Sequence, residues 1–106
     1  NAWGSDQMAK PDINFTIRQL EYFVAVAASG SITGGARLVH ASDSAVSDAI
    51  GVLEQSLGAE LFRRRRSKGV NLTSDGLALL PLARGLLTEA ERLGHRRMPC
   101  PPFQAA

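Results

Sequence analysis

The sequence lacks what secreted and membrane proteins depend on. Its 106 residues include one cysteine, Cys100, so no disulfide framework can form, and a reducing compartment is expected. No apolar run approaches the ~20 residues that cross a bilayer. No basic stretch followed by an apolar block marks a signal peptide. We therefore expect a cytoplasmic protein that makes no contact with a membrane.

Signals for catalysis and for cofactors are missing as well. The sequence offers no set of nucleophile, base and orienting group, and His40 has no second ligand at metal spacing. The pair Gly34-Gly35 is not followed by Lys-Ser/Thr and does not follow a strand, so it is no phosphate loop. We expect no enzyme, no cofactor, no metal and no small-molecule site.

Charge is present but unevenly placed. Arg63, Arg64, Arg65, Arg66 and Lys68 crowd into six positions, whereas residues 42–62 hold four acids and no Lys or Arg. Such a basic tip most often meets phosphate, because neutralising phosphates releases the counterions of a nucleic acid. A solvated surface loop is the alternative interpretation of the charge run.

Three capped helical patterns open the chain. Thr16, Ser31 and Ser42 each stand where a side-chain oxygen would cap a helix, and Gly30 and Gly58 stand where the first and third patterns stop. Apolar residues recur at helical spacing between these positions. The short link between the second and third patterns predicts a helix-turn-helix.

The periodicity changes after Gly58. Residues 60–64 and 70–72 read as two short strands, with the basic residues 65–69 at the tip between them. A two-stranded hairpin is not stable alone, so it must lean on the helices. A hairpin attached to a helix-turn-helix is a wing.

Thr73 then caps a fourth helix that extends to about Leu93 and contains Pro81. We expect Leu77 and Leu80 to face the domain. A second stripe has coiled-coil spacing and predicts dimerisation; it consists of Leu79, Leu82, Leu86 and Leu93. The alternative is that the helix lies in one wide groove of the core.

Residues 17–93 resemble the N-terminal DNA-binding domain of LysR-type transcriptional regulators. The order and spacing of several short motifs carry the resemblance: Arg18-Gln19-Leu20-Glu21-Tyr22-Phe23, Gly30-Ser31-Ile32-Thr33, Ala36-Arg37-Leu38-Val39-His40-Ala41-Ser42, Ala45-Val46-Ser47, Leu53-Glu54-Gln55-Ser56-Leu57-Gly58, Leu61-Phe62-Arg63-Arg64 and Leu72-Thr73-Ser74-Asp75-Gly76.

The resemblance implies a mainly α fold, a winged helix-turn-helix of three helices and a β-hairpin wing followed by a long linker and dimerisation helix. It divides the chain into a tail or purification-tag remnant (1–12), the DNA-binding domain (13–73), the linker helix (74–94) and an irregular tail (95–106). Family members regulate transcription as homodimers on interrupted dyad operators in double-stranded DNA. They carry a C-terminal effector-binding domain, which this sequence does not contain, so we expect a fragment or a short form.

The expected DNA contacts come from the start of the third helix, the wing and two further helix starts. They are Thr33, Ser42, Asp43, Ser44, Ser47, Asp48, Arg63, Arg64, Arg65, Arg66, Lys68 and Thr73. The family usually has Gln in place of Asp43, Pro in place of Ser44, and Arg or Lys in place of Asp48. Carboxylates are repelled by phosphates, so we expect binding that depends on the wing and on salt. Those acids also keep open a second hypothesis, a dimerising module that pairs with full-length regulators and binds DNA weakly.

Overall fold

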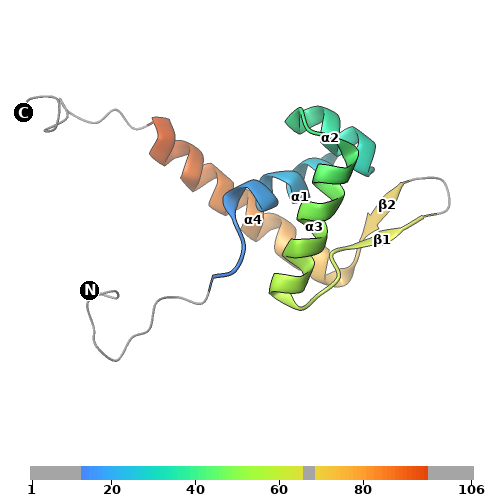
Figure 1. Cartoon of the computed structure of the whole chain (residues 1–106). Coiled ribbons are helices and arrows are strands. Elements are labelled where there is room, and N and C mark those ends of the chain that lie inside the picture. The colour runs from blue at the N-terminus through green and yellow to red at the C-terminus, as the bar shows by residue number, and fades with distance from the viewer. Residues whose placement is uncertain (1–12, 66–68, 96–106) are drawn as a thin grey trace, which may run out of the picture.

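The computed structural model describes residues 13–65 and 69–95. The elements follow the order α1 (Ile17–Ser29), α2 (Ile32–Val39), α3 (Asp43–Leu57), β1 (Phe62–Arg64), β2 (Val70–Leu72) and α4 (Ser74–His95). The first three helices pack together, the hairpin projects from one side, and the end of α4 extends away from them (Figure 1). This arrangement confirms the mainly α class and the winged helix-turn-helix.

Local capping fixes the helix ends where the sequence predicted them. The amide of Gln19 donates to Thr16 Oγ1 at 3.1 Å, and the amide of Thr16 donates to Gln19 Oε1 at 2.9 Å, which completes a capping box. Ser31 and Ser42 accept from backbone amides three residues on. The glycines that end α1 and α3 have φ of 82° and 68°, a region that favours glycine.

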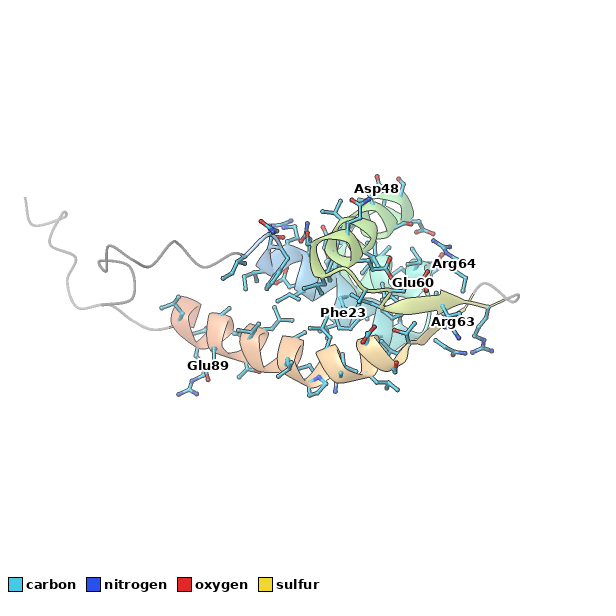
Figure 2. The ribbon with its side chains drawn as sticks, turned by 90° about the horizontal axis from the view of Figure 1, so that it is seen from below. Phe23, Asp48, Glu60, Arg63, Arg64 and Glu89 are labelled. Carbon is cyan, nitrogen blue, oxygen red and sulfur yellow. The ribbon has the colours of Figure 1, made fainter. Side chains whose placement is uncertain are left out.

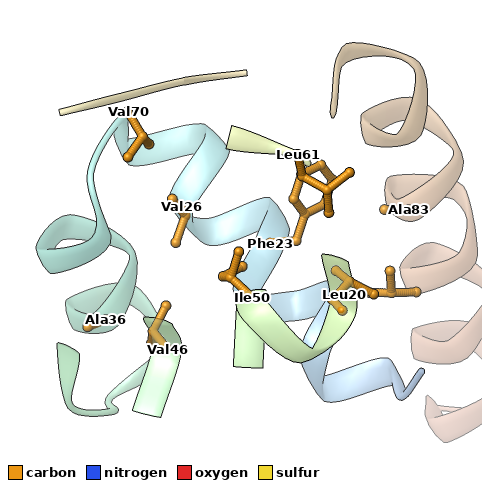
Figure 3. Packing of buried hydrophobic residues seen from close by; sticks show 10 residues of the cluster. Leu20, Phe23, Val26, Ala36, Val46, Ile50, Leu61, Val70 and Ala83 are labelled. Atoms are coloured by element: carbon orange, nitrogen blue, oxygen red, sulfur yellow. The ribbon is translucent and has the colours of Figure 1, made fainter. Parts of the chain in front are cut away.

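The core lies where α1, α3 and the root of the wing meet. Leu20, Phe23 and Val26 of α1 are almost fully buried, and Val46 and Ile50 of α3 face them (Figure 3). The helix α2 approaches α1 closely at Gly35. A Cβ at Gly35 would lie 2.9 Å from the Cα of Val26, so this contact needs a glycine. The small residues of α2 thus admit the close approach of α1.

The wing is shorter than predicted. Phe62 pairs with Leu72 and Arg64 with Val70 in an antiparallel ladder, but residues 60 and 61 lie outside it. The reason is that the backbone of Leu61 has other partners. Its amide donates to Glu54 Oε2 at 2.7 Å, and its carbonyl accepts from the amide of Thr73 at 3.0 Å. Residues 60 and 61 therefore join the wing to α3 and α4.

The face of α4 that meets the core is built around small residues. Gly76 and Ala83 are buried, and partly buried leucines at 79, 80 and 87 pack beside them. The prediction for Leu80 is confirmed. The prediction for Leu77 is wrong, because its side chain is 61% exposed. Leu79 of the second stripe is partly buried, and the buried part of its side chain packs against the core.

The outer face of α4 keeps three of the leucines expected there. Leu82, Leu86 and Leu93 are 65%, 48% and 71% exposed. The helix continues through Pro81 and ends at His95, close to the predicted end. None of the helices in residues 13–65 and 69–95 combines the length and apolar character needed to cross a membrane.

Candidate DNA-binding surface

The first half of α3 presents short polar side chains to solvent. Ser42, Asp43, Ser44 and Asp48 are exposed, and Ser47 is half-buried. Ser42 caps the helix by accepting from the amide of Ala45 at 3.0 Å, which fixes the orientation of this end. Hydroxyl groups on an exposed helix start can contact base edges or phosphate oxygens, and carboxylates there can accept hydrogen bonds from base edges.

The wing meets α3 through Arg64. A guanidinium nitrogen of Arg64 lies 3.4 Å from Ser47 Oγ, to which it donates. Figure 2 shows Arg64 at the side of the molecule where Asp48 projects, away from α4. A single duplex can therefore touch both the wing and α3. A wing that carried Arg64 away from Ser47 would not allow this.

The run of arginines does not form one patch, because side chains alternate between the two faces of a strand. Phe62, Arg64 and Val70 belong to the inner face, where Phe62 and Val70 pack against the core. Arg63 and Arg65 belong to the outer face. Arg65 donates to Asn71 Oδ1 at 3.4 Å, and Arg63 borders a shallow depression with Glu60 and Asp75. Arg66 and Lys68 lie outside the described residues.

A second contact ties α2 to the start of α3. The hydroxyl of Thr33, near the first turn of α2, donates to Asp43 Oδ2 at 2.6 Å. Asp43 and Ser47 are one helical turn apart and so lie along one flank of α3. A continuous line of polar side chains therefore crosses α2, α3 and β1. We call this line the polar seam; it consists of Thr33, Asp43, Ser47 and Arg64.

Among the other expected contact residues, Asp48 and Thr73 have surroundings of their own. Asp48 is exposed on the outward side of α3 (Figure 2) and has no side-chain partner among the described residues. Thr73 borders the same depression as Arg63. Its hydroxyl donates to the carbonyl of Glu60 and accepts from the amide of Gly76 at 3.0 Å. Thr73 therefore caps α4, as predicted, and its hydroxyl proton is already used.

Three contacts that hold the wing were not predicted. Glu54 of α3 accepts from the amides of Leu61 and Phe62 at 2.7 and 3.3 Å. The rings of Phe62 and Phe23 lie 5.3 Å apart at 50°. The amide of Val70 donates to the carbonyl of Gly30 at 2.9 Å. One usable signal in the sequence was the aromatic residue next to Leu61, while Glu54 looked like any acid beside an apolar stripe.

Clustered metal ligands and ion pairs are scarce in the part of the chain that the structure describes. No group of three or more His, Cys, Asp or Glu side chains is placed to hold a metal ion there. The only ion pair found among these residues joins Glu89 to Arg92 at 3.2 Å, on the far part of α4. The polar seam is thus a set of hydrogen-bonding groups with one cation.

Known proteins share this fold and much of its sequence. ClcR from Pseudomonas putida, named as an HTH-type transcriptional regulator, is 46% identical over 81 residues, which are 74% of this chain and 27% of ClcR. The chain thus spans about a quarter of that relative's length. The CbnR_DBD–DNA complex superposes with a TM-score of 0.71 at 38% identity, covering 76% of this chain and 91% of that one.

The BenM_DBD/benA site 1 DNA complex gives a TM-score of 0.69 at 32% identity over 74% of this chain and 91% of its own. Residues 17–77 match the family described as bacterial regulatory helix-turn-helix proteins of the lysR family. This match covers all of α1 to β2 and the start of α4, including the polar seam. The chain belongs to the LysR family of bacterial helix-turn-helix transcriptional regulators.

Proposed function

We propose that this chain binds double-stranded DNA as the DNA-binding part of a transcriptional regulator, and that it has no catalytic role. The observation that carries the proposal is the contact of Arg64 with Ser47 at 3.4 Å, which joins the wing and α3 into one surface. Two structural neighbours, CbnR_DBD and BenM_DBD, are complexes with DNA. Because its target is DNA, we also propose that the protein acts in the bacterial cytoplasm.

In the proposed pose the start of α3 enters the major groove, as recognition helices do. The polar side chains of this segment then lie at base edges or beside phosphates; they are Ser42, Asp43, Ser44, Ser47 and Asp48. Thr33 lies at the adjoining start of α2, close to the DNA backbone that borders this groove. Arg64 contacts the backbone or the minor groove next to it. On the outer face of the wing, Arg63 and Arg65 reach phosphates further along, with Arg66 and Lys68 adding charge at the tip, whereas Thr73 caps α4 and donates its proton within the chain.

The wing and α3 differ in charge, so we propose different roles for them in DNA binding. The groove-facing part of α3 carries Asp43 and Asp48 and no cation, so it is repelled by phosphate. The cations come from the wing. Because each phosphate contact releases counterions, an affinity that comes from arginines falls steeply with salt. We propose that the wing supplies most of the affinity and that α3 supplies the selectivity.

The proposed division of the chain places DNA binding in residues 13–73 and pairing in α4. Leu82, Leu86 and Leu93 expose an apolar stripe, and a second copy of the chain covers it in the proposed homodimer. Leu79 lies at the edge of this stripe and contributes to both contacts. Two copies related by a twofold axis would read two half-sites of an interrupted dyad operator.

A salt titration tests the proposal. Binding of the chain to fluorescent duplex DNA is measured by anisotropy from low to high salt. We expect the logarithm of the association constant to fall linearly with the logarithm of the salt concentration. Arg64→Ala should weaken binding to every duplex and reduce the slope by about 1. Arg92→Ala makes the same charge change on α4 and should leave the slope unchanged. An affinity that does not change with salt would contradict the proposal.

A further inference from the structure

The hydrogen bond between Thr33 and Asp43 is at 2.6 Å the shortest side-chain contact in the polar seam. Both residues are exposed, and they come from different helices. We propose that Asp43, held in place by Thr33, selects cytosine in the major groove. This inference rests on the proposed function, because it requires the start of α3 to enter that groove.

Asp43 stands where a base-reading residue is needed. It is the first residue of α3, and recognition helices contact base edges with their N-terminal residues. The hydroxyl of Thr33 donates to Oδ2 of Asp43. This contact restricts the rotation of the carboxylate, so less entropy is lost when Asp43 meets a base. Oδ1 receives no hydrogen bond in the described part of the chain and is the atom that would read the base.

The chemistry of the carboxylate determines which base it accepts. An ionised carboxylate can only accept hydrogen bonds. In the major groove, guanine presents the acceptors N7 and O6, and thymine presents O4 and a methyl group. Cytosine presents the N4 amino donor. Adenine presents an N6 donor, but its N7 acceptor lies beside it and repels a carboxylate. The expected order is cytosine first, adenine second, and guanine and thymine last.

A purely structural role explains Asp43 but does not explain Thr33. The dipole of α3 favours an acid in its first turn whether or not a hydroxyl lies nearby. A hydrogen bond between two exposed groups also adds little to folding, since water replaces it. The hydrogen bond that Thr33 donates from α2 has a clearer effect, because it sets the direction in which the carboxylate of Asp43 points. Thr33 is therefore a positioning residue, and Asp43 is the residue that touches the base.

The test selects DNA sequences from a randomised duplex library with the 106-residue chain. Single-position variants of the selected duplex are then measured by anisotropy. We expect a cytosine in each half-site whose replacement by thymine weakens binding about 10-fold. Asp43→Asn keeps the size of the side chain and adds a donor, so the preference at that position should move to adenine, which amides read through N6 and N7.

Thr33→Val removes the hydroxyl and keeps the shape of the side chain. It should reduce the cytosine preference several-fold at that same position and leave the salt slope unchanged, and Thr33→Ser should restore the preference. Glu91→Gln makes the same charge change as Asp43→Asn at an exposed site on α4, away from the polar seam. It should leave the cytosine position unchanged. Circular dichroism of each variant confirms that the helices are intact.

The outcomes separate this inference from the function on which it rests. A base preference that is the same in the wild-type chain and in Asp43→Asn overturns the role of Asp43. Equal preferences in the wild-type chain and in Thr33→Val overturn the positioning role of Thr33. Salt-dependent binding with no base preference at all also overturns the inference and leaves the proposed function standing. If no duplex binds even at low salt, the proposed function itself is wrong.

Discussion

Two glycines of α4 look alike in the sequence and differ in their surroundings. A Cβ at Gly76 would overlap the carbonyl oxygen of Leu61 and approach Leu72 Cδ2 to 2.8 Å, whereas a Cβ at Gly85 would meet nothing within 4 Å. We expect Gly76→Ala to lower the free energy of unfolding by about 2 kcal/mol, since the neighbouring atom is backbone and cannot rotate away.

The matched change Gly85→Ala should raise the free energy of unfolding by about 0.5–1 kcal/mol, because alanine favours a helix interior. Urea unfolding followed by circular dichroism measures both variants. If Gly76→Ala proved as stable as Gly85→Ala, the close packing of α4 against Leu61 would be wrong.

Glu54 is the side chain that fixes the root of the wing. Its carboxylate accepts from the amides of Leu61 and Phe62, and Leu61 is almost fully buried. Glu54→Ala leaves both amides without that acceptor, and we expect the free energy of unfolding to fall by about 2 kcal/mol. Hydrogen exchange should become faster at these two amides. Glu60→Ala removes an exposed acid nearby whose side chain makes no hydrogen bond in the described residues, and its effect should stay within about 0.5 kcal/mol.

At the level of single residues, the sequence predicted those side chains that hydrogen-bond to the backbone a few positions away. The caps Thr16, Ser31 and Ser42 fall in this class, because each bonds an amide three residues away. Glu54 could not be recognised, since its partners lie seven and eight residues on and meet it only after the chain turns at Gly58. A contact that depends on the path of a turn leaves no periodic signal.

The wing acts as an element with two unlike faces. Arg64 lies on the face that meets α3, and Arg63 lies on the opposite face beside Glu60 and Asp75. We therefore expect Arg64→Ala to weaken DNA binding more than Arg63→Ala, although the two changes remove the same charge. Anisotropy at one fixed salt concentration compares them. Equal losses would mean that the wing contributes general positive charge and that its orientation toward α3 is irrelevant.

The elements themselves were predictable, but their facing sides were only partly so. For α4 the leucine-rich sequence allows several apolar stripes, and a choice made from leucines alone placed the exposed Leu77 on the side that meets the core. The helix instead turns Gly76 and Ala83 toward the core, and the missing side chain at Gly76 lets α4 approach the backbone of Leu61 closely. The alternation of β1 was equally visible in the sequence, yet which of Arg63 and Arg64 faces α3 depends on how the wing docks.

At the scale of the whole molecule, the polar seam and the exposed leucines of α4 occupy different sides. Figure 2 shows Asp48 at one edge of the molecule and α4, with Glu89, at the opposite edge. A partner on α4 would therefore leave α3 and the wing open to DNA. The proposed homodimer and the proposed DNA contact are compatible for this reason, and each can be disturbed separately.

The outer stripe of α4 allows that separation to be tested. At about 100° per residue, Leu82, Leu86 and Leu93 fall within about 40° of one another, whereas Leu77 lies roughly opposite. Leu82→Glu together with Leu86→Glu puts two charges into the proposed interface, so sedimentation should show a monomer. Leu77→Glu is a matched single change at a site 61% exposed and should leave the dimer intact.

The monomeric variant should keep its helical circular dichroism, because Leu82 and Leu86 are exposed and do not belong to the core. It should bind a single half-site as the wild-type chain does. It should lose affinity for a two-half-site duplex, where the dimer gains from binding both halves at once. Should the double variant still sediment as a dimer, the pairing surface would have to lie elsewhere, and a twofold operator would need another explanation than α4.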